Sequence, residues 1–144
     1  MRALLDTSVL VAAVVAAHPV HGAALPWLQR AKRREFEFFV AAHTIAELYS
    51  VLSTLPVRPR ISPAIAWRLI SENVIFCARL VPLSEADYRS VVKAVADHGL
   101  SGGIVFDALI ARAAEKRRVD RLVTLNVEDF RRVWPSGADV VGPP

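Results

Sequence analysis

The chain begins with Met1-Arg-Ala-Leu-Leu-Asp-Thr-Ser-Val-Leu10, in which an apolar, strand-like run stops at Asp6. A carboxylate at the end of a buried strand loses its hydration, so it needs a partner charge, hydrogen bonds or a bound cation. These ten residues leave two roles open for Asp6. It could cap the helix expected from Thr7 to Ala17, or it could belong to a functional site where the strand ends.

Strand-like and helix-like segments alternate along the rest of the chain. Aromatic and β-branched runs predict strands at residues 36–42, 78–82 and 120–125, with a possible edge strand at 139–141. Apolar spacing and capping residues predict helices at residues 20–34, 43–53, 62–76, 84–99, within 100–118 and at 126–130. This alternation predicts a three-layer α/β/α fold with a parallel sheet of four to five strands.

The composition narrows the class of protein. A chain of 144 residues fits a single domain spanning residues 1–144, and 53% hydrophobic residues exclude a disordered chain. The net charge of +4 favours a polyanionic partner, with nucleic acid as the first candidate. Because Asp6 interrupts the first apolar run, Cys77 is the only cysteine and no run reaches membrane-spanning length, we expect a cytoplasmic protein without a membrane partner.

Asp107 stands out among the other acids. Its neighbours at helical spacing, Gly103, Ile104, Ile110 and Ala111, are small or apolar, so its side chain projects from a face that should be buried. The predicted helix holds Asp107 in its middle. The alternative is that the helix tilts this single position into solvent.

Glu47 has two interpretations. Thr44-Ile-Ala-Glu47 matches a capping box, in which the glutamate would bond to the start of its own helix. That helix also follows a predicted strand, so Glu47 could instead point into the cleft at the carboxyl ends of the strands. Asp6 and Asn126 both come just after predicted strands and should lie on the same side.

Three carboxylates in one cleft would repel each other and be partly protonated unless a cation were bound. The expected metal ligands are Asp6, Glu47 and Asp107. Hard oxygen ligands without cysteine or paired histidine nearby suit Mg²⁺, or Mn²⁺, rather than zinc. Phosphodiester hydrolysis is the chemistry that uses such a site.

Two runs of cations follow helical segments, Arg30 to Arg34 and Lys116 to Arg118. They could be favourable charges at helix C-termini, or they could contact the phosphates of a nucleic acid. The sequence leaves both interpretations open.

A resemblance to a known family rests on four parts of the chain: Leu4-Leu-Asp-Thr-Ser8, Glu47, Ser101-Gly-Gly-Ile-Val-Phe-Asp-Ala-Leu-Ile110 and Leu122-Val-Thr-Leu-Asn-Val-Glu-Asp-Phe130. In this order they resemble PIN-domain ribonucleases of the VapC toxin type. The resemblance implies a PIN-like fold and Mg²⁺-dependent endonucleolytic cleavage of RNA. It also implies a homodimer and a cognate antitoxin of a type II toxin–antitoxin pair. The family's acidic triad falls on Asp6, Glu47 and Asp107, with Ser8 as a polar neighbour.

One position departs from that family. Many members carry an acid just after the last core strand, where this chain has Asn126. Asn126 could accept a hydrogen bond at the site but adds no charge, and Asp129 could restore the charge as a fourth catalytic acid. Alternatively, Asp129 is an ordinary acid of a first helical turn, like Glu128 beside it.

Other functions have less support. A non-catalytic PIN-like domain that binds RNA or acts as a scaffold is the main alternative, and the retained acids argue against it. Nucleotide-binding glycine motifs are absent. Ser8, His43 and Asp107 could suggest a hydrolytic triad, but the chain has no G-x-S-x-G elbow.

Overall fold

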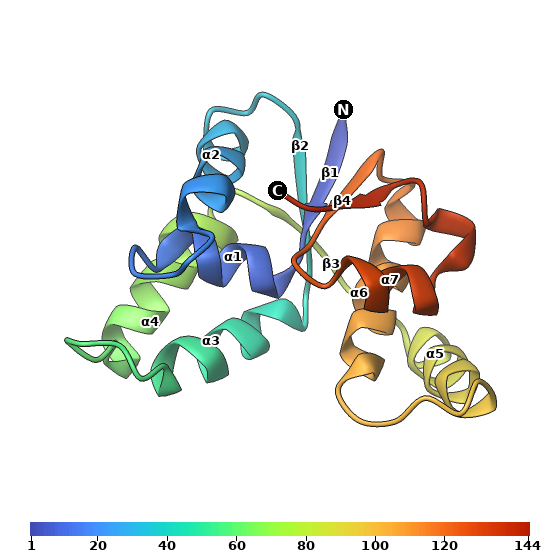
Figure 1. The fold of residues 1–144 in the computed structure, drawn as a ribbon. Helices are drawn as coiled ribbons and strands as arrows, with labels where there is room; N and C mark the ends of the chain where they lie inside the picture. The colour runs from blue at the N-terminus through green and yellow to red at the C-terminus, as the bar shows by residue number, and fades with distance from the viewer.

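The computed structural model describes all 144 residues, and its centre is one five-stranded parallel sheet in the order β3-β2-β1-β4-β5. The strands are β1 (Arg2–Leu5), β2 (Glu37–Ala41), β3 (Arg79–Val81), β4 (Arg121–Val123) and β5 (Val141–Gly142). Helices cover both faces of this sheet (Figure 1). The predicted three-layer α/β/α architecture is therefore confirmed, with β5 as an edge strand.

The helices divide between the two faces (Figure 1). One face carries α1 (Thr7–Val14), α2 (His21–Lys32), α3 (Thr44–Thr54) and α4 (Pro63–Ile70). The other carries α5 (Glu85–Asp97), α6 (Ile104–Arg117) and α7 (Val127–Val133). Two short helical turns complete the chain, a π-helical turn at Ser71–Ile75 and a 3₁₀ turn at Pro135–Gly137.

The apolar run of β1 is continuous because the strand is buried on both sides. Leu4 packs in the core beneath α6 and α7, whereas Leu5 packs in the core beneath α1 and α3. Both leucines are fully buried, and each contributes about 1.5–3 kcal/mol by leaving water. Consecutive residues of a strand point to opposite faces of the sheet. Because helices cover both faces here, the buried residues of the strand are apolar whichever face they point to.

Several predicted boundaries were wrong. The first helix ends at Val14 rather than Ala17, because Val15 turns to an extended conformation. The helix expected over residues 62–76 stops at Ile70 and continues as the π-helical turn. Helix α6 begins at Ile104, after Gly102 with its left-handed φ of +74°, so Asp107 lies in the first turn and not in the middle.

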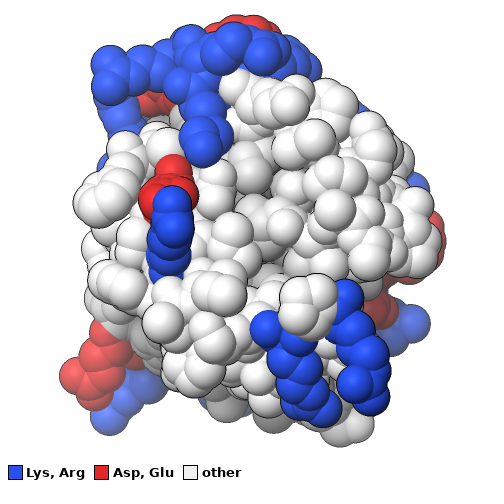
Figure 2. All heavy atoms as spheres, turned by 90° about the vertical axis from the view of Figure 1, so that its left-hand side faces the viewer, with Lys and Arg blue, Asp and Glu red and all other residues white.

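Charge is distributed unevenly over the surface. Figure 2 views the face covered by α1 to α4 and shows lysine and arginine gathered along its upper edge, above a broad area with few charges. Large apolar side chains are exposed on and near α4, among them Ile65, Trp67 and Phe76. None of the helices combines the length and the apolar character needed to cross a bilayer.

Candidate active site

The acids singled out in the sequence lie at the carboxyl ends of the parallel strands. Asp6 directly follows β1, Glu47 is in the first turn of α3, and Asp107 and Asp129 are in the first turns of α6 and α7. The charge of Asp6 acts on both Glu47 and Asp107, and those of Asp129 and Glu47 also act on Asp107. The fold therefore brings the other three carboxylates within range of the charge of Asp107.

Asp6 is buried, with only 2% of its surface exposed, and two hydroxyl groups hold its carboxylate. Ser8 Oγ donates to Asp6 Oδ2 over 2.6 Å, and Thr124 Oγ1 donates to the same oxygen over 2.8 Å. Burial raises the pKa of Asp6, and these two hydrogen bonds oppose the rise. Asp6 occupies the N-cap position of α1 without a side-chain capping hydrogen bond, and the backbone N–H groups of Thr7 and Ser8 contribute less to lowering its pKa than the two hydroxyls do, so capping is not its main role.

Thr124 is a site residue that the sequence analysis missed. It is fully buried just after β4, and the register that pairs Leu5 with Val123 places it beside Asp6. Thr124 Oγ1 also accepts from the Asn126 backbone N–H over 2.9 Å. A threonine after an apolar strand looks ordinary in the sequence, because only the pairing of β1 with β4 shows that it faces a buried carboxylate.

Glu47 does not close a capping box. The N-cap of α3 is His43, with no side-chain capping bond, and Thr44 is fully buried with its hydroxyl 3.4 Å from that of Thr7. Glu47 instead faces His43, with 3.3 Å between Oε1 and the ring Nε2. Burial, reinforced by the charge of Asp6, raises the pKa of Glu47 to about 7. Burial also lowers the pKa of His43, so its imidazole is largely neutral at neutral pH.

Asp107 is half-buried, so the alternative of a merely exposed acid is wrong. Burial raises its pKa to about 7, and the charges of Asp6, Asp129 and Glu47 add to the rise in that order. A carboxyl group in this state is partly protonated at neutral pH. A cation bound nearby would lower the pKa again and favour the ionised form.

The remaining predicted site residues, Asp129 and Asn126, differ in burial and in their relation to the acids. Asp129 is half-buried and coupled to Asp107, whereas the side chain of Glu128 is 90% exposed and lies 3.7 Å from Arg131. Asn126 is exposed, and its side chain makes no hydrogen bond to the acids. No three acid, histidine or cysteine side chains converge closely enough to enclose a metal ion as they stand. The acids form a coupled cluster without a closed ligand cage.

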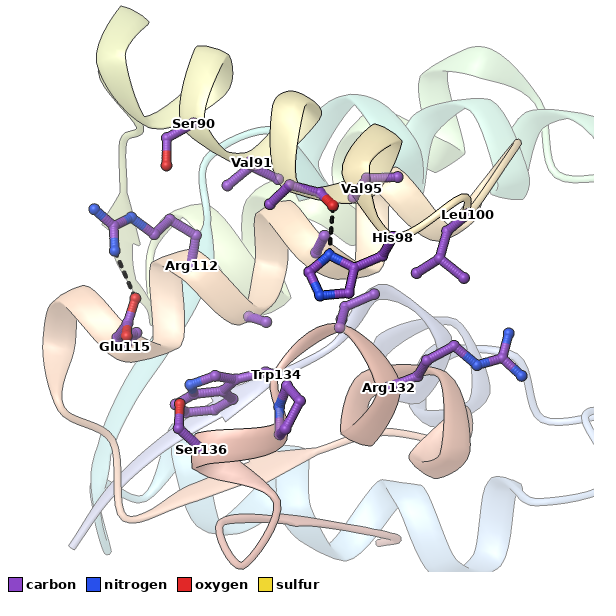
Figure 3. Close-up of a pocket in the computed structure, with 15 residues that line it drawn as sticks. Ser90, Val91, Val95, His98, Leu100, Arg112, Glu115, Arg132, Trp134 and Ser136 are labelled. Carbon is purple, nitrogen blue, oxygen red and sulfur yellow. Dashed lines mark hydrogen bonds and ion pairs between the residues drawn. The ribbon is translucent and has the colours of Figure 1, made fainter.

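A hollow lined by apolar and charged side chains lies elsewhere in the protein. It lies between α5, α6 and the segment after α7, has a volume of about 240 Å³, and includes none of the four acids. Figure 3 shows Arg112 and Glu115 at one end, Arg132 at the other, and His98 and Trp134 between them. The four acids therefore lie outside this hollow.

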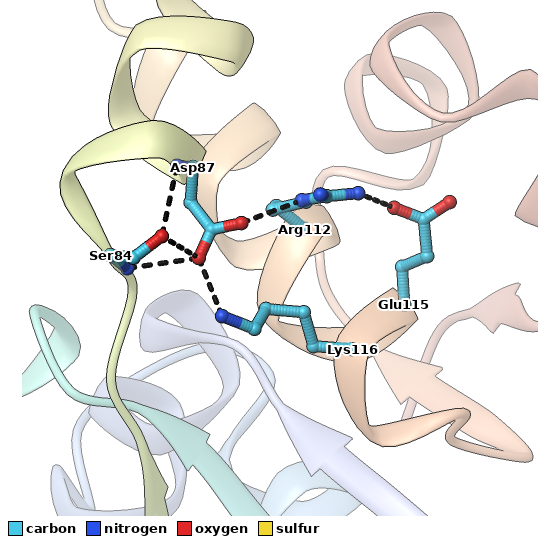
Figure 4. Close-up of polar contacts among 5 residues, drawn as sticks. All are labelled: Ser84, Asp87, Arg112, Glu115 and Lys116. Carbon is cyan, nitrogen blue, oxygen red and sulfur yellow. Dashed lines mark hydrogen bonds and ion pairs between the residues drawn. The ribbon is translucent and has the colours of Figure 1, made fainter.

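The helix that carries Asp107 is tied to α5 by an ionic network around the buried side chain of Asp87 (Figure 4). The side chain of Asp87 is 6% exposed and accepts from Arg112 Nε over 3.0 Å and from Lys116 Nζ over 2.5 Å. Ser84 and Asp87 also form a complete capping box at the start of α5. Lys116 and these hydrogen bonds hold the pKa of Asp87 well below its usual range. The network fixes α6, which packs on the sheet, against α5.

Comparisons with known proteins agree with this fold. The model of the PIN domain family matches residues 3–134. Ribonuclease VapC27 of Mycobacterium tuberculosis is 36% identical over 115 residues, which cover 80% of this chain and 78% of the relative. Ribonuclease VapC40 of the same species is 34% identical over 131 residues, covering 89% and 91%.

Solved structures with low sequence identity share the fold. VapBC2 from Rickettsia felis, bound to a DNA fragment from its promoter, contains a chain with a TM-score of 0.66 at 20% identity, covering 99% of this chain and 98% of that one. FitAcB from Neisseria gonorrhoeae gives 0.65 at 19% identity, covering 99% and 96%. The family match over most of the chain and the two relatives above 30% identity lead to one conclusion: this chain belongs to the PIN domain family.

Proposed function

We propose that this protein is a Mg²⁺-dependent endoribonuclease and the toxin of a type II toxin–antitoxin pair. The observation that carries the proposal is the cluster of Asp6, Glu47, Asp107 and Asp129 at the carboxyl edge of the sheet. Burial raises the pKa of the first three, and the charges of neighbouring acids add to the rise at Glu47 and Asp107. Such a cluster costs stability in the empty protein, which is expected where a cation normally compensates it. The names of the VapC27 and VapC40 ribonucleases support the choice of RNA as the substrate.

The donor set fits a hard divalent cation, because it consists of carboxylate oxygens with no cysteine nearby. Asp6, Glu47 and Asp107 would hold the ion. A bound Mg²⁺, or Mn²⁺ in its place, would activate the attacking water and neutralise charge on the phosphate. Ser8 and Thr124 hold Asp6 in place through Oδ2, so the protein orients one of the three proposed ligands, whereas Glu47 Oε1 has no hydrogen-bond partner and lies 3.3 Å from His43 Nε2.

The partners follow from the same resemblance to VapC toxins. We infer a cognate antitoxin protein and a homodimer, and the exposed Ile65, Trp67 and Phe76 offer apolar area for protein contacts. We expect the protein to act in the cytoplasm, where its RNA substrate and its antitoxin would be. Co-expression with the product of a short neighbouring reading frame tests the pairing, because a true antitoxin should co-purify and suppress cleavage.

Sequencing the 5′ ends of RNA fragments after expression in a permissive host tests the main proposal. We expect new 5′ ends at a small set of sites, appearing with the wild type and disappearing with Asp107→Asn. Mg²⁺ should also raise the melting temperature of the purified wild type, because an ion that binds only the native state stabilises it. RNA binding without any new 5′ ends would favour the alternative, a non-catalytic PIN-like domain.

A paired substitution tests whether Asp129 is the fourth acid. Asp129 is coupled to Asp107, whereas Glu128 points into solvent, so only Asp129→Asn should raise the Mg²⁺ concentration needed for half-maximal cleavage. We expect an increase of roughly tenfold or more, the scale seen when groups supporting a metal site are removed. Glu128→Gln is the matched control, and equal small effects of the two changes would show that Asp129 belongs only to the helix.

A further inference from the structure

The parallel topology gathers cations at the amino edge of the sheet, opposite the acids. Strands β1 and β3 begin there with Arg2 and Arg79, and helices α2 and α6 end there because each leads directly into the next strand (Figure 1). We define the basic edge as the following exposed residues: Arg2, Arg33, Arg34, Arg79, Arg117 and Arg118. The two cationic runs of the sequence, about 80 residues apart, thus lie on one side of the molecule.

Two hollows make this surface continuous. One, of about 260 Å³, is lined by Arg2, Phe39, Lys116, Arg117 and Arg118. The other, of about 520 Å³, includes Met1, Arg34 and Phe38. Both contain Glu37 and Arg79, so the concave surface runs from the end of α2 across the strand starts to the end of α6. Figure 2 shows the α2 side of this surface as the band of cations along the upper edge.

The surface keeps unpaired positive charge. Arg33 is paired with Glu35, and Arg79 is paired with Glu37. The side chains of Arg34, Arg117 and Arg118 make no ion pair with any carboxylate. These three guanidinium groups are free to contact a phosphate.

Favourable charge at helix C-termini does not explain all of these residues. That effect fades beyond the last turn, and Arg30 with Lys32, and Lys116 with Arg117, already occupy the last turns of α2 and α6. Arg34 and Arg118 follow the helices in the left-handed conformation, with φ of +59° and +47°. Glycine is the residue that this conformation favours, so arginine at both positions points to a role for the side chain.

We propose that the basic edge is a second RNA-binding surface that holds phosphates of the substrate remote from the bond that is cut. The inference rests on the proposed ribonuclease function. Asp6 and Arg2 lie at opposite ends of β1, and a strand of four residues is about 13 Å long. Because helices cover both faces of the sheet, an RNA that reaches both edges must pass around a helical layer, and its path is longer than the strand itself (Figure 1). This makes long or folded RNA the preferred substrate class over strands of a few nucleotides.

The test uses glycine to remove charge without straining the backbone. The double variant Arg34→Gly with Arg118→Gly should fold with an unchanged or higher melting temperature, since both positions are left-handed. In the cleavage-defective Asp107→Asn background, the slope of log affinity against log salt for a long RNA should become shallower by about 1.4, because each phosphate that the protein no longer neutralises reduces the slope by roughly 0.7. Arg34→Lys with Arg118→Lys should keep most of the slope.

Controls separate the surface from general charge and from the cut site. Arg58→Gln with Arg60→Gln removes the same charge from the exposed loop before α4 and should leave the slope unchanged. Without the Asp107 change, the glycine variant should cleave a single strand of about three nucleotides, too short to reach from the acids to the basic edge, at the wild-type rate. It should cleave the long RNA at least about tenfold less efficiently. An unchanged salt slope, or an equal loss with the short strand, would overturn the proposal. If neither protein cleaves any RNA, the proposed function fails, while the binding slopes still decide this inference.

Discussion

Replacing Asp107 with asparagine is expected to abolish RNA cleavage and, at the same time, to stabilise the metal-free protein at pH 8. The first effect follows from removing a proposed ligand, and we expect the rate to fall by roughly 10²–10³-fold or more. The second follows from the repulsion among the acids, since Asp107 is opposed by Asp6, Asp129 and Glu47. Few structural mutations combine lost activity with a higher melting temperature.

The stabilisation should depend on pH in a defined way. The folded-state pKa of Asp107 is raised from 3.8 to about 7, so between these values the native protein binds more protons than the unfolded chain. Wild-type stability therefore falls as the pH rises from about 4 to about 7, and the Asp107→Asn change removes this contribution. Because Asp107 is half-buried, solvent screening reduces the gain to about 1–2 kcal/mol above pH 7.

Urea unfolding in the presence of a chelator at pH 5 and pH 8 measures this gain. The difference between Asp107→Asn and the wild type should be larger at pH 8. Glu128→Gln serves as the control, because its side chain is 90% exposed and should change neither stability nor cleavage appreciably. An Asp107→Asn protein that cleaves RNA at the wild-type rate would contradict the proposed metal site.

Replacing Asp87 with asparagine is expected to lower the stability of the protein clearly more than replacing an acid of an exposed ion pair does. The side chain is 6% exposed and holds Arg112, Lys116 and the capping box of α5 together. Removing its charge takes the shared acceptor away from Arg112 and Lys116, whose side chains are 39% and 37% exposed and regain only part of the lost interaction from water. The urea midpoint at pH 7 should fall clearly below that of the wild type.

Acid should erase this difference. The pKa of Asp87 lies below its usual range, so its contribution is fully present above an unfolded pKa of about 4 and is lost as the pH falls through the folded pKa. The wild type and Asp87→Asn should therefore become more alike below pH 4. Asp97→Asn breaks an exposed pair with Lys93 and should have little effect at either pH. If Asp87→Asn and Asp97→Asn behave alike, the network does not fix α6.

Local features of the chain were sufficient to predict the elements and the layers. Apolar runs that are buried on both faces identified β1 and β4, and the serines at 62 and 84 marked helix starts where both side chains cap. Asp6 and Asp107 were recognisable because a carboxylate in an apolar context is costly in any fold. Their catalytic roles stay predictions, as do those of Glu47, Ser8, Asn126 and Asp129.

The start of the helix that carries Asp107 and the environment of Glu47 could not be predicted from neighbouring residues, because tertiary packing decides both. Thr44-Ile-Ala-Glu47 satisfies the capping-box rule, yet tertiary packing buries Thr44 against Thr7 and leaves Glu47 facing His43. A capping bond is worth about 1 kcal/mol, which the burial of a helix start beside the sheet can easily outweigh. The expected convergence of three acids is likewise incomplete. Their charges repel one another, but their side chains do not come close enough together to enclose a metal ion.

The sequence by itself determined the alternation of strands and helices and the identity of the acids, because both depend only on the spacing and type of neighbouring residues. The tertiary structure alone decided which distant residues meet. Thr124 reaches Asp6 only through the register of β4 against β1, and Arg34 joins Arg118 only because parallel strands start at a common edge. Strand order and register arise from packing across the whole sheet, so no local stretch of the chain contains them.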